Sequence, residues 1–352
     1  MVLPISTYAA QLENRRNILA IQNQLNIQQA AISTGVKSQT YSGLNEEVQK
    51  LISLKDQKLA TEGYIKAIKS SAARMEVYQN TIDQIVSIIG DVKAEYLKNR
   101  YTVDTSTVQQ GLLRDRAETA LREVTRLLNV KYEDRFLFSG NDVDTPQPMV
   151  DPGLITGAAG LAGGPLQDIR NLLNGPPAGG SATAIAAVDA YFQSTVPATV
   201  ANFYQGSFTQ TAGTIPIAVH IDRTINVRYG LRGDNAAVRT TLEGLYLIAN
   251  NFYSAASSAD YFAVLDQAFT ELQTSEDSWL QLGGTMGVQQ QLMDQVETRH
   301  ESTVNFLTKQ IGDLQDADPA EAITRLQSLQ ATLQSSFQVT ATLRTLTLTN
   351  FL

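Results

Sequence analysis

The sequence predicts a mainly α-helical protein: a long coiled-coil helical bundle formed by the N- and C-terminal regions, with a small β-containing insert domain in the middle. Three observations support this fold class. Apolar residues recur at alternating steps of three and four near both ends, both ends carry helical stretches almost without charge, and the middle is rich in Gly and Pro. The expected segments are 1–40 (N-terminal helix), 41–140 (long helical arm), 141–233 (variable insert domain), 234–316 (returning helical arm) and 317–352 (C-terminal helix).

The N-terminal helix is free of charged residues over positions 17–36, "NILAIQNQLNIQQAAISTGV". Its many Asn and Gln side chains argue against a membrane-spanning helix, because their polar groups would be unsatisfied in hydrocarbon. Ile18, Ile21, Leu25 and Ile32 follow one side of a heptad pattern. A helix on the surface of a soluble monomer normally carries Lys and Glu on its outer face. We therefore expect this helix to be enclosed by protein.

Two apolar stripes predict long helices in the first arm. Each repeats at steps of three and four residues, which places its members on one helix face. We expect the two helices to fold back on each other as an antiparallel pair. The stripes are Met75, Tyr78, Ile82, Ile85, Ile89, Val92 and Tyr96, followed by Leu113, Ala117, Ala120, Val124 and Leu127.

The middle of the chain shows no sustained helical period and contains the stretches "GAAGLAGGP" and "GPPAGG". Within it, apolar residues alternate along 215–221 and again along 225–229, on either side of Asp222 and Arg223. Alternation on both sides of a short polar connection predicts a β-hairpin. We therefore expect a small β-containing insert domain.

The returning arm begins with Asp234 as an expected helix cap, followed by apolar residues on one face at Leu242, Leu245, Ala249 and Phe252. A shorter pattern follows around Phe262 and Leu272. A third long stripe then runs, with one phase slip, through Met293, Val296, His300, Val304, Leu307, Ile311 and Leu314.

The last helix starts at a sequence typical of a helix cap, and charged residues are rare in the rest of it. Asp318 can accept hydrogen bonds from free amides, Pro319 stands where a missing N–H costs nothing, and Glu321 can reach back to complete a capping box. Beyond Leu326 the only charged residue is Arg344. Leu326, Leu333 and Phe337 lie on or near one face, which we expect to be buried against other helices.

Composition and motifs argue against most chemical functions. A net charge of −8 disfavours binding to nucleic acid or acidic membranes, and the absence of Cys excludes disulfides and thiol chemistry. His220 and His300 have no partner at metal-ligand spacing, so we expect no metal and no cofactor. Neither HExxH nor GxSxG occurs, and an enzyme is not expected. The first twenty residues do not form a cleavable signal peptide, so export would use another route.

Four segments together resemble the bacterial flagellin superfamily. They are the N-terminal heptads with "ISTGVKSQTYSG", then "RFLFSGNDVDTPQP", then "DLQDADPAEAITRLQSLQATLQ", and the ending "LRTLTLTNFL". The resemblance covers roughly the first 145 and last 120 residues. The segment "FLFSGNDVDTP" and the ending Asn350–Phe351–Leu352 resemble the hook-associated junction proteins of this superfamily more than its filament flagellins.

The resemblance implies a structural role by helical self-assembly at the hook–filament junction. In this family the chain ends line the inner core of a tube, which assigns assembly contacts to Ile18, Ile21, Leu25, Ile32, Leu326, Leu333, Phe337, Leu346 and Phe351. Asp318, Pro319 and Glu321 would mark the joint between inner and outer helices.

The implied partners are copies of the same chain, hook-associated protein 1 on the hook side, flagellin on the filament side, and an export chaperone at about 310–352. The implied location is the extracellular flagellum, reached through the flagellar secretion channel. Two alternatives remain: a filament flagellin and, from another functional class, an enzyme hosted in the insert.

Overall fold

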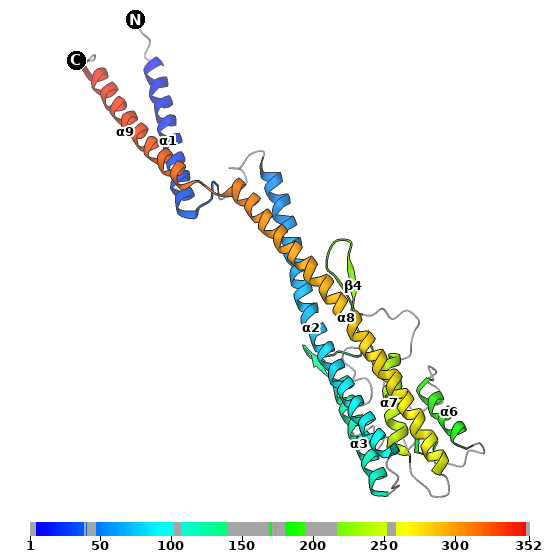
Figure 1. Ribbon diagram of the computed structural model, residues 1–352. Coiled ribbons are helices and arrows are strands. Elements are labelled where there is room, and N and C mark those ends of the chain that lie inside the picture. Colours follow the sequence, from blue (N-terminus) through cyan, green and yellow to red (C-terminus); the bar gives the residue numbers. More distant parts are fainter. Residues whose placement is uncertain are drawn as a thin grey trace, which may run out of the picture. The chain divides into compact units, whose positions relative to one another are not determined.

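The computed structural model describes residues 5–38, 40, 47–101, 107–139, 169–170, 173, 180–193, 217–251 and 258–349 (Figure 1). The predicted fold class is confirmed: long helices dominate, and short strand pairs lie in the middle of the sequence. The chain divides into two compact units. The terminal unit comprises 1–63 and 299–352, and the central unit comprises 64–298. The boundaries of the five expected segments stay predictions.

In the terminal unit, α1 (Ile5–Thr34) packs along α9 (Pro319–Thr349) (Figure 1). Their less exposed side chains recur at steps of three and four, as in a two-stranded coiled coil. We call these residues the terminal seam: Ile18, Ile21, Leu25, Gln28 and Ala31 from α1, and Ala322, Leu326, Leu329, Leu333, Ser336 and Thr340 from α9.

The seam departs from the predicted heptad at one position. Ile32 is 37% exposed, whereas Ala31 beside it is only 5% exposed. The seam residue after Gln28 is therefore Ala31, three positions on, and not Ile32, four positions on. The expectation that Ile32 shares a seam with Ile18, Ile21 and Leu25 is therefore wrong.

The central unit is built on α2 (Val48–Tyr101), α3 (Thr107–Leu128) and α8 (Ser258–Gln315), of which α2 and α8 continue into the terminal unit. Arg116 on α3 pairs with Asp91 on α2, and Glu133, just beyond α3, lies near Arg74, so α2 and α3 run antiparallel. Both predicted stripes of these helices are buried. Lys69 pairs with Glu297 and Arg100 with Asp266, which orders α2 and α8 antiparallel as well.

Helix α7 (Ala236–Asn250) lies in the core of the central unit, with most of its residues buried. Its N-cap is Asn235, whose Oδ1 accepts a hydrogen bond from the amide of Ala237 at 3.0 Å. The expected cap, Asp234, instead forms an ion pair with Arg232 at 2.9 Å. A carboxylate held by a guanidinium is not free to cap, so the assignment to Asp234 is corrected.

The predicted hairpin is present as β3 (Ala218–His220) paired antiparallel with β4 (Asn226–Arg228). A second pair, β1 (Lys131–Tyr132) and β2 (Arg135–Phe136), was not expected. Its two-residue turn places Glu133 and Asp134 at positive φ, which suits the twist of a tight hairpin but is uncommon outside Gly, Asn and Asp.

The insert also contains a helix, although its sequence shows no sustained helical period. Helix α6 spans Gly180–Gln193 and buries Ala184, Val188 and Phe192, which follow one another at four-residue steps on one face. This four-residue spacing of apolar residues is visible in the sequence, but the flanking Gly and Pro residues obscured it.

Candidate assembly surface

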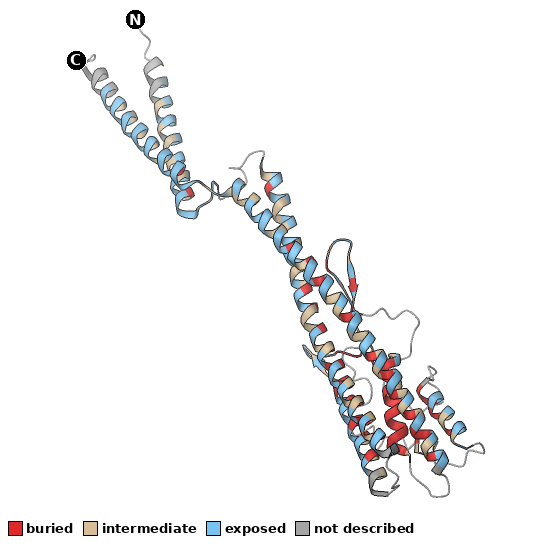
Figure 2. Ribbon diagram, in the orientation of Figure 1, coloured by how far each residue is buried: buried red, intermediate tan, exposed pale blue. Residues whose placement is uncertain are grey.

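The outer faces of the terminal helices expose large apolar side chains. Leu19 is 52% exposed and Phe337 is 50% exposed. Figure 2 shows exposed residues along most of α1 and α9. We call the following residues the exposed apolar set: Leu12, Leu19 and Ile27 on α1, with Ile323, Phe337 and Val339 on α9. Apolar side chains repeated on both helices of a pair are typical of an interaction surface.

The polar positions between them carry almost no charge. No charged residue occurs from 17 to 34 of α1, and beyond Arg325 the only one in α9 is Arg344. Surface helices of soluble proteins normally keep Lys and Glu on the water-facing side. From 17 to 34 of α1 and from 326 to 343 of α9, the polar groups on the outer faces are therefore all uncharged.

The hydroxyl groups of α9 are already hydrogen-bonded within the helix. Thr324 donates to the carbonyl of Ala320 at 2.8 Å, Thr332 to Ser328 at 2.8 Å, and Ser335 to Ala331 at 3.0 Å. Burying a donor without a partner costs about 1–3 kcal/mol, and these donors keep their partners when water is removed. This face can therefore be covered by another helix at low cost.

The predicted assembly residues divide between the seam and the outer faces. Leu326 and Leu333 are half-buried in the terminal seam, together with Ile18, Ile21 and Leu25 from α1. Ile32 and Phe337 are exposed on the outer faces. Leu346 belongs to α9 but its side chain lies outside the described residues, as does all of Phe351. The exposed residues Leu19 and Ile27 were missed because the heptad analysis selected one face only.

A short backbone bridge ties the segment after α1 to the segment before α9. Gly35 adopts φ +74°, which reverses the chain at the end of α1, and Val36 pairs with Asp316. The amide of Ala317 donates to the Gly35 carbonyl at 2.9 Å, and that of Lys37 to the Gln315 carbonyl at 2.8 Å. The Lys37 ammonium group also donates to the Asp313 carbonyl at 2.9 Å, at the negative end of the α8 dipole.

Helix α9 begins at the cap that the sequence marks. Asp318 Oδ1 accepts from the amide of Ala320 at 2.8 Å and from that of Glu321 at 3.4 Å. Glu321 does not complete the expected capping box: its carboxylate pairs with Arg325 at 2.6 Å. Arg325 lies one turn later on the same face of α9. The ion pair between Glu321 and Arg325 forms in place of a hydrogen bond from the neutral backbone amide of Asp318 to Glu321.

We expect Asp318→Ala to destabilise the first turn of α9 by about 1 kcal/mol, because two amides lose their acceptor. The substitution should speed hydrogen exchange at the start of α9 roughly fivefold, while exchange in α7 stays unchanged. Asp318→Asn is the matched control, since an Asn side chain also caps. Equal exchange in the Ala and Asn variants would contradict this role.

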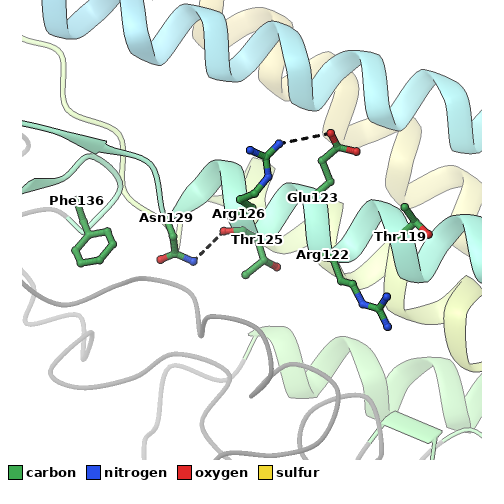
Figure 3. A pocket seen from close by; sticks show the side chains of 7 residues that line it. All are labelled: Thr119, Arg122, Glu123, Thr125, Arg126, Asn129 and Phe136. Atoms are coloured by element: carbon green, nitrogen blue, oxygen red, sulfur yellow. Dashed lines mark hydrogen bonds and ion pairs between the residues drawn. The ribbon is translucent and has the colours of Figure 1, made fainter.

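A hollow of about 560 Å³ lies on the outer side of α3 beside β2 (Figure 3). Arg126 turns toward Glu123 at 3.7 Å, and Asn129 donates to the Thr125 carbonyl at 2.8 Å. These contacts do not pair a nucleophile with a base. Its described lining residues are Thr119, Arg122, Glu123, Thr125, Arg126, Asn129 and Phe136.

In the described part of the chain, no group of three or more acidic, His or Cys side chains is arranged to hold a metal ion. None of its helices combines the length and the apolarity needed to traverse a bilayer.

Comparisons with known proteins point to the flagellum. Residues 263–352, which cover most of α8 and all of α9, match the bacterial flagellin C-terminal helical region. The fold is similar to a solved structure from Vibrio parahaemolyticus whose assignment as a flagellar hook-associated protein is itself provisional. That similarity has a TM-score of 0.52 at 12% identity and covers 76% of this chain and 97% of the other. No curated protein matches the sequence significantly.

Proposed function

From the flagellin C-terminal region and the fold shared with the Vibrio protein, we propose that the chain is a structural protein of the bacterial flagellum that assembles through α1 and α9. The observation that carries this proposal is the surface of the terminal unit. Its exposed residues Leu19, Ile27, Phe337 and Val339 stand among polar groups that are uncharged, and hydroxyls of α9 are hydrogen-bonded within their own helix. Such a surface is suited to burial by identical neighbours.

The finer proposal places the chain at the junction between hook and filament, as a protein of the hook-associated protein 3 type. Support comes from the "FLFSGNDVDTP" segment and the Asn350–Phe351–Leu352 ending. The proposed partners are further copies of the chain, hook-associated protein 1 on the hook side and flagellin on the filament side. An export chaperone would hold about 310–352 before secretion, and the assembled protein would be extracellular.

A filament flagellin is the main alternative, and the behaviour of purified protein separates the two. A flagellin forms long filaments by itself, whereas a junction protein forms a short zone between unlike partners. Electron microscopy of concentrated protein should show no micrometre-long filaments if the junction proposal holds. An enzyme hosted in the insert is less favoured, because both the family match and the structural neighbour are flagellar proteins.

We expect Phe337→Asp to weaken self-association by more than about 100-fold, because a carboxylate would be buried in each contact between subunits. Phe337 is half exposed in the monomer, so the fold should be unaffected. Cells that express only this variant should shed flagellin into the medium. The measurements are sedimentation of the purified protein and recovery of flagellin from culture supernatant.

Thr274→Asp is the matched control, since Thr274 is exposed on α8 in the central unit and lies outside the terminal helices. It introduces the same charge into a helix and should leave association unchanged. Normal association of the Phe337 variant would exclude this face as the assembly surface.

A further inference from the structure

A buried acidic group lies at the meeting point of three helices in the central unit. Glu243 on α7 is only 2% exposed, although a lone carboxylate is among the most costly groups to bury. Residues on either side of it pack tightly. A Cβ atom added at Gly244 would lie 2.8 Å from Leu272 Cγ of α8, and the Tyr246 ring lies 5.6 Å from that of Phe192 on α6.

Among the described residues, the charged groups that act on Glu243 are acidic. Glu271 on α8 and Asp189 on α6 both repel its charged form. Arg239, one turn earlier on α7, is occupied elsewhere: its Nε donates to the carbonyl of Asp234 at 2.9 Å. On α3, Arg122, Glu123 and Arg126 point to the exposed side. Burial, followed by this repulsion, raises the pKa of Glu243 to about 8, and burial raises the pKa of Glu271 as well.

The sequence supplies few cations that could compensate. Between Arg135 and Arg223 the only Lys or Arg is Arg170, and no attractive charge contributes to the ionisation of Glu243. Gln267 donates to the Glu271 carboxylate at 2.7 Å, which satisfies one oxygen without adding positive charge. The three carboxyl groups of Asp189, Glu243 and Glu271, which we call the acidic cluster, therefore repel one another least when Glu243 is protonated.

Of the helices that carry the acidic cluster, α6 is the shortest. Hydrogen bonds join α7 to α8: Trp279 Nε1 donates to Thr241 Oγ1 at 2.9 Å and Ser275 to the Ala237 carbonyl at 3.2 Å. On α6, the Ser181 amide donates a hydrogen bond to Asp260 Oδ1 of α8 at 3.4 Å. A helix of 14 residues is marginal without packing partners.

We propose that the acidic cluster is a proton-operated clasp for α6. With Glu243 neutral, Ala184, Val188 and Phe192 hold α6 in the core of the central unit. With Glu243 ionised, repulsion from Asp189 drives α6 away, and water reaches the new charge. The packing of α7 on α8 persists because its hydrogen bonds carry no titrating group.

Hydrogen exchange of the full-length protein, corrected for the intrinsic pH dependence of exchange, tests this proposal. The opening constant of α6 should rise by up to about tenfold for each pH unit between pH 5 and 8, and then level off. The fluorescence of Trp279, the only tryptophan, should stay constant over the same range. A flat profile for α6, or joint loss of protection in α6 and α7, would overturn the clasp.

Three variants sharpen the test. Glu243→Gln should keep α6 protected at every pH, because the amide cannot ionise. Asp189→Asn changes an exposed residue, so it should fold normally, and because it lowers the pKa of Glu243 the profile should level off at a lower pH. Glu276→Gln is the matched control: it also removes a carboxylate from α8, but one that pairs with Lys93, and should leave the α6 profile unchanged. A Glu243→Gln profile that still follows pH would refute the assignment.

Discussion

Leu333→Asp is expected to abolish assembly while the central unit unfolds at its normal temperature. Leu333 is half-buried in the terminal seam, where α9 packs along α1. An aspartate there either buries an unpaired carboxylate, which costs several kcal/mol, or opens the seam to hydrate it. Because the defect repeats in every subunit, we expect secreted flagellin that is not retained on the hook.

The matched control is Leu333→Ala, which removes the leucine contact without adding charge. For a half-buried leucine the loss is expected near the lower end of the usual range of about 2–5 kcal/mol, so partial assembly should remain. Limited proteolysis should trim α1 and α9 faster in the Asp variant than in the Ala variant, and calorimetry should show one unchanged transition for the central unit. Melting of the central unit in the Asp variant would mean that α9 belongs to its core.

Glu243→Gln is expected to stabilise the central unit by about 3 kcal/mol at pH 7 and to have no effect near pH 4. The pKa of Glu243 is about 8 in the folded protein against an ordinary value of 4.5. A raised folded pKa gives stability that is complete below about pH 4.5 and is lost as pH rises toward 8. Glutamine stays neutral throughout, so the difference between variant and wild type should grow over that interval.

Urea unfolding of both proteins at several pH values measures this difference directly, because the other carboxylates cancel in the comparison. Above pH 8 the difference should level off at about 5 kcal/mol. Glu276→Gln should behave oppositely and destabilise the protein at pH 7, since Lys93 loses its partner. A pH-independent difference between wild type and the Glu243 variant would show that the carboxyl stays ionised in the folded state.

Several features of this protein follow from local sequence patterns. The stripes along α2 and α3 predicted which faces are buried, because three- and four-residue spacing places side chains on one side of any α-helix. The start of α9 at Pro319 was predictable for the same kind of reason. Asp318 lies within one turn of the amides that it caps, so the neighbours that decide its role are already in the sequence.

Other features needed some knowledge of packing. Helix α6 has a clear apolar face, yet the Gly and Pro residues around it hid a segment whose helical state depends on burial against the core. At the end of α1, Ala31 is buried and Ile32 is exposed, which the heptad spacing did not predict and only the packing of the helix pair decided.

The sequence by itself determined the long helices, their apolar faces and the charge-free ends, because each of these depends on residues within a few turns of one another. Only the tertiary structure decided the chemistry of Glu243. In the sequence Glu243 and Glu276 are both glutamates of amphipathic helices. In the fold, Glu243 is repelled by Glu271 and Asp189, whereas Glu276 forms an ion pair with Lys93. A pKa depends on burial and on charges nearby in space, and those neighbours come from helices far apart along the chain.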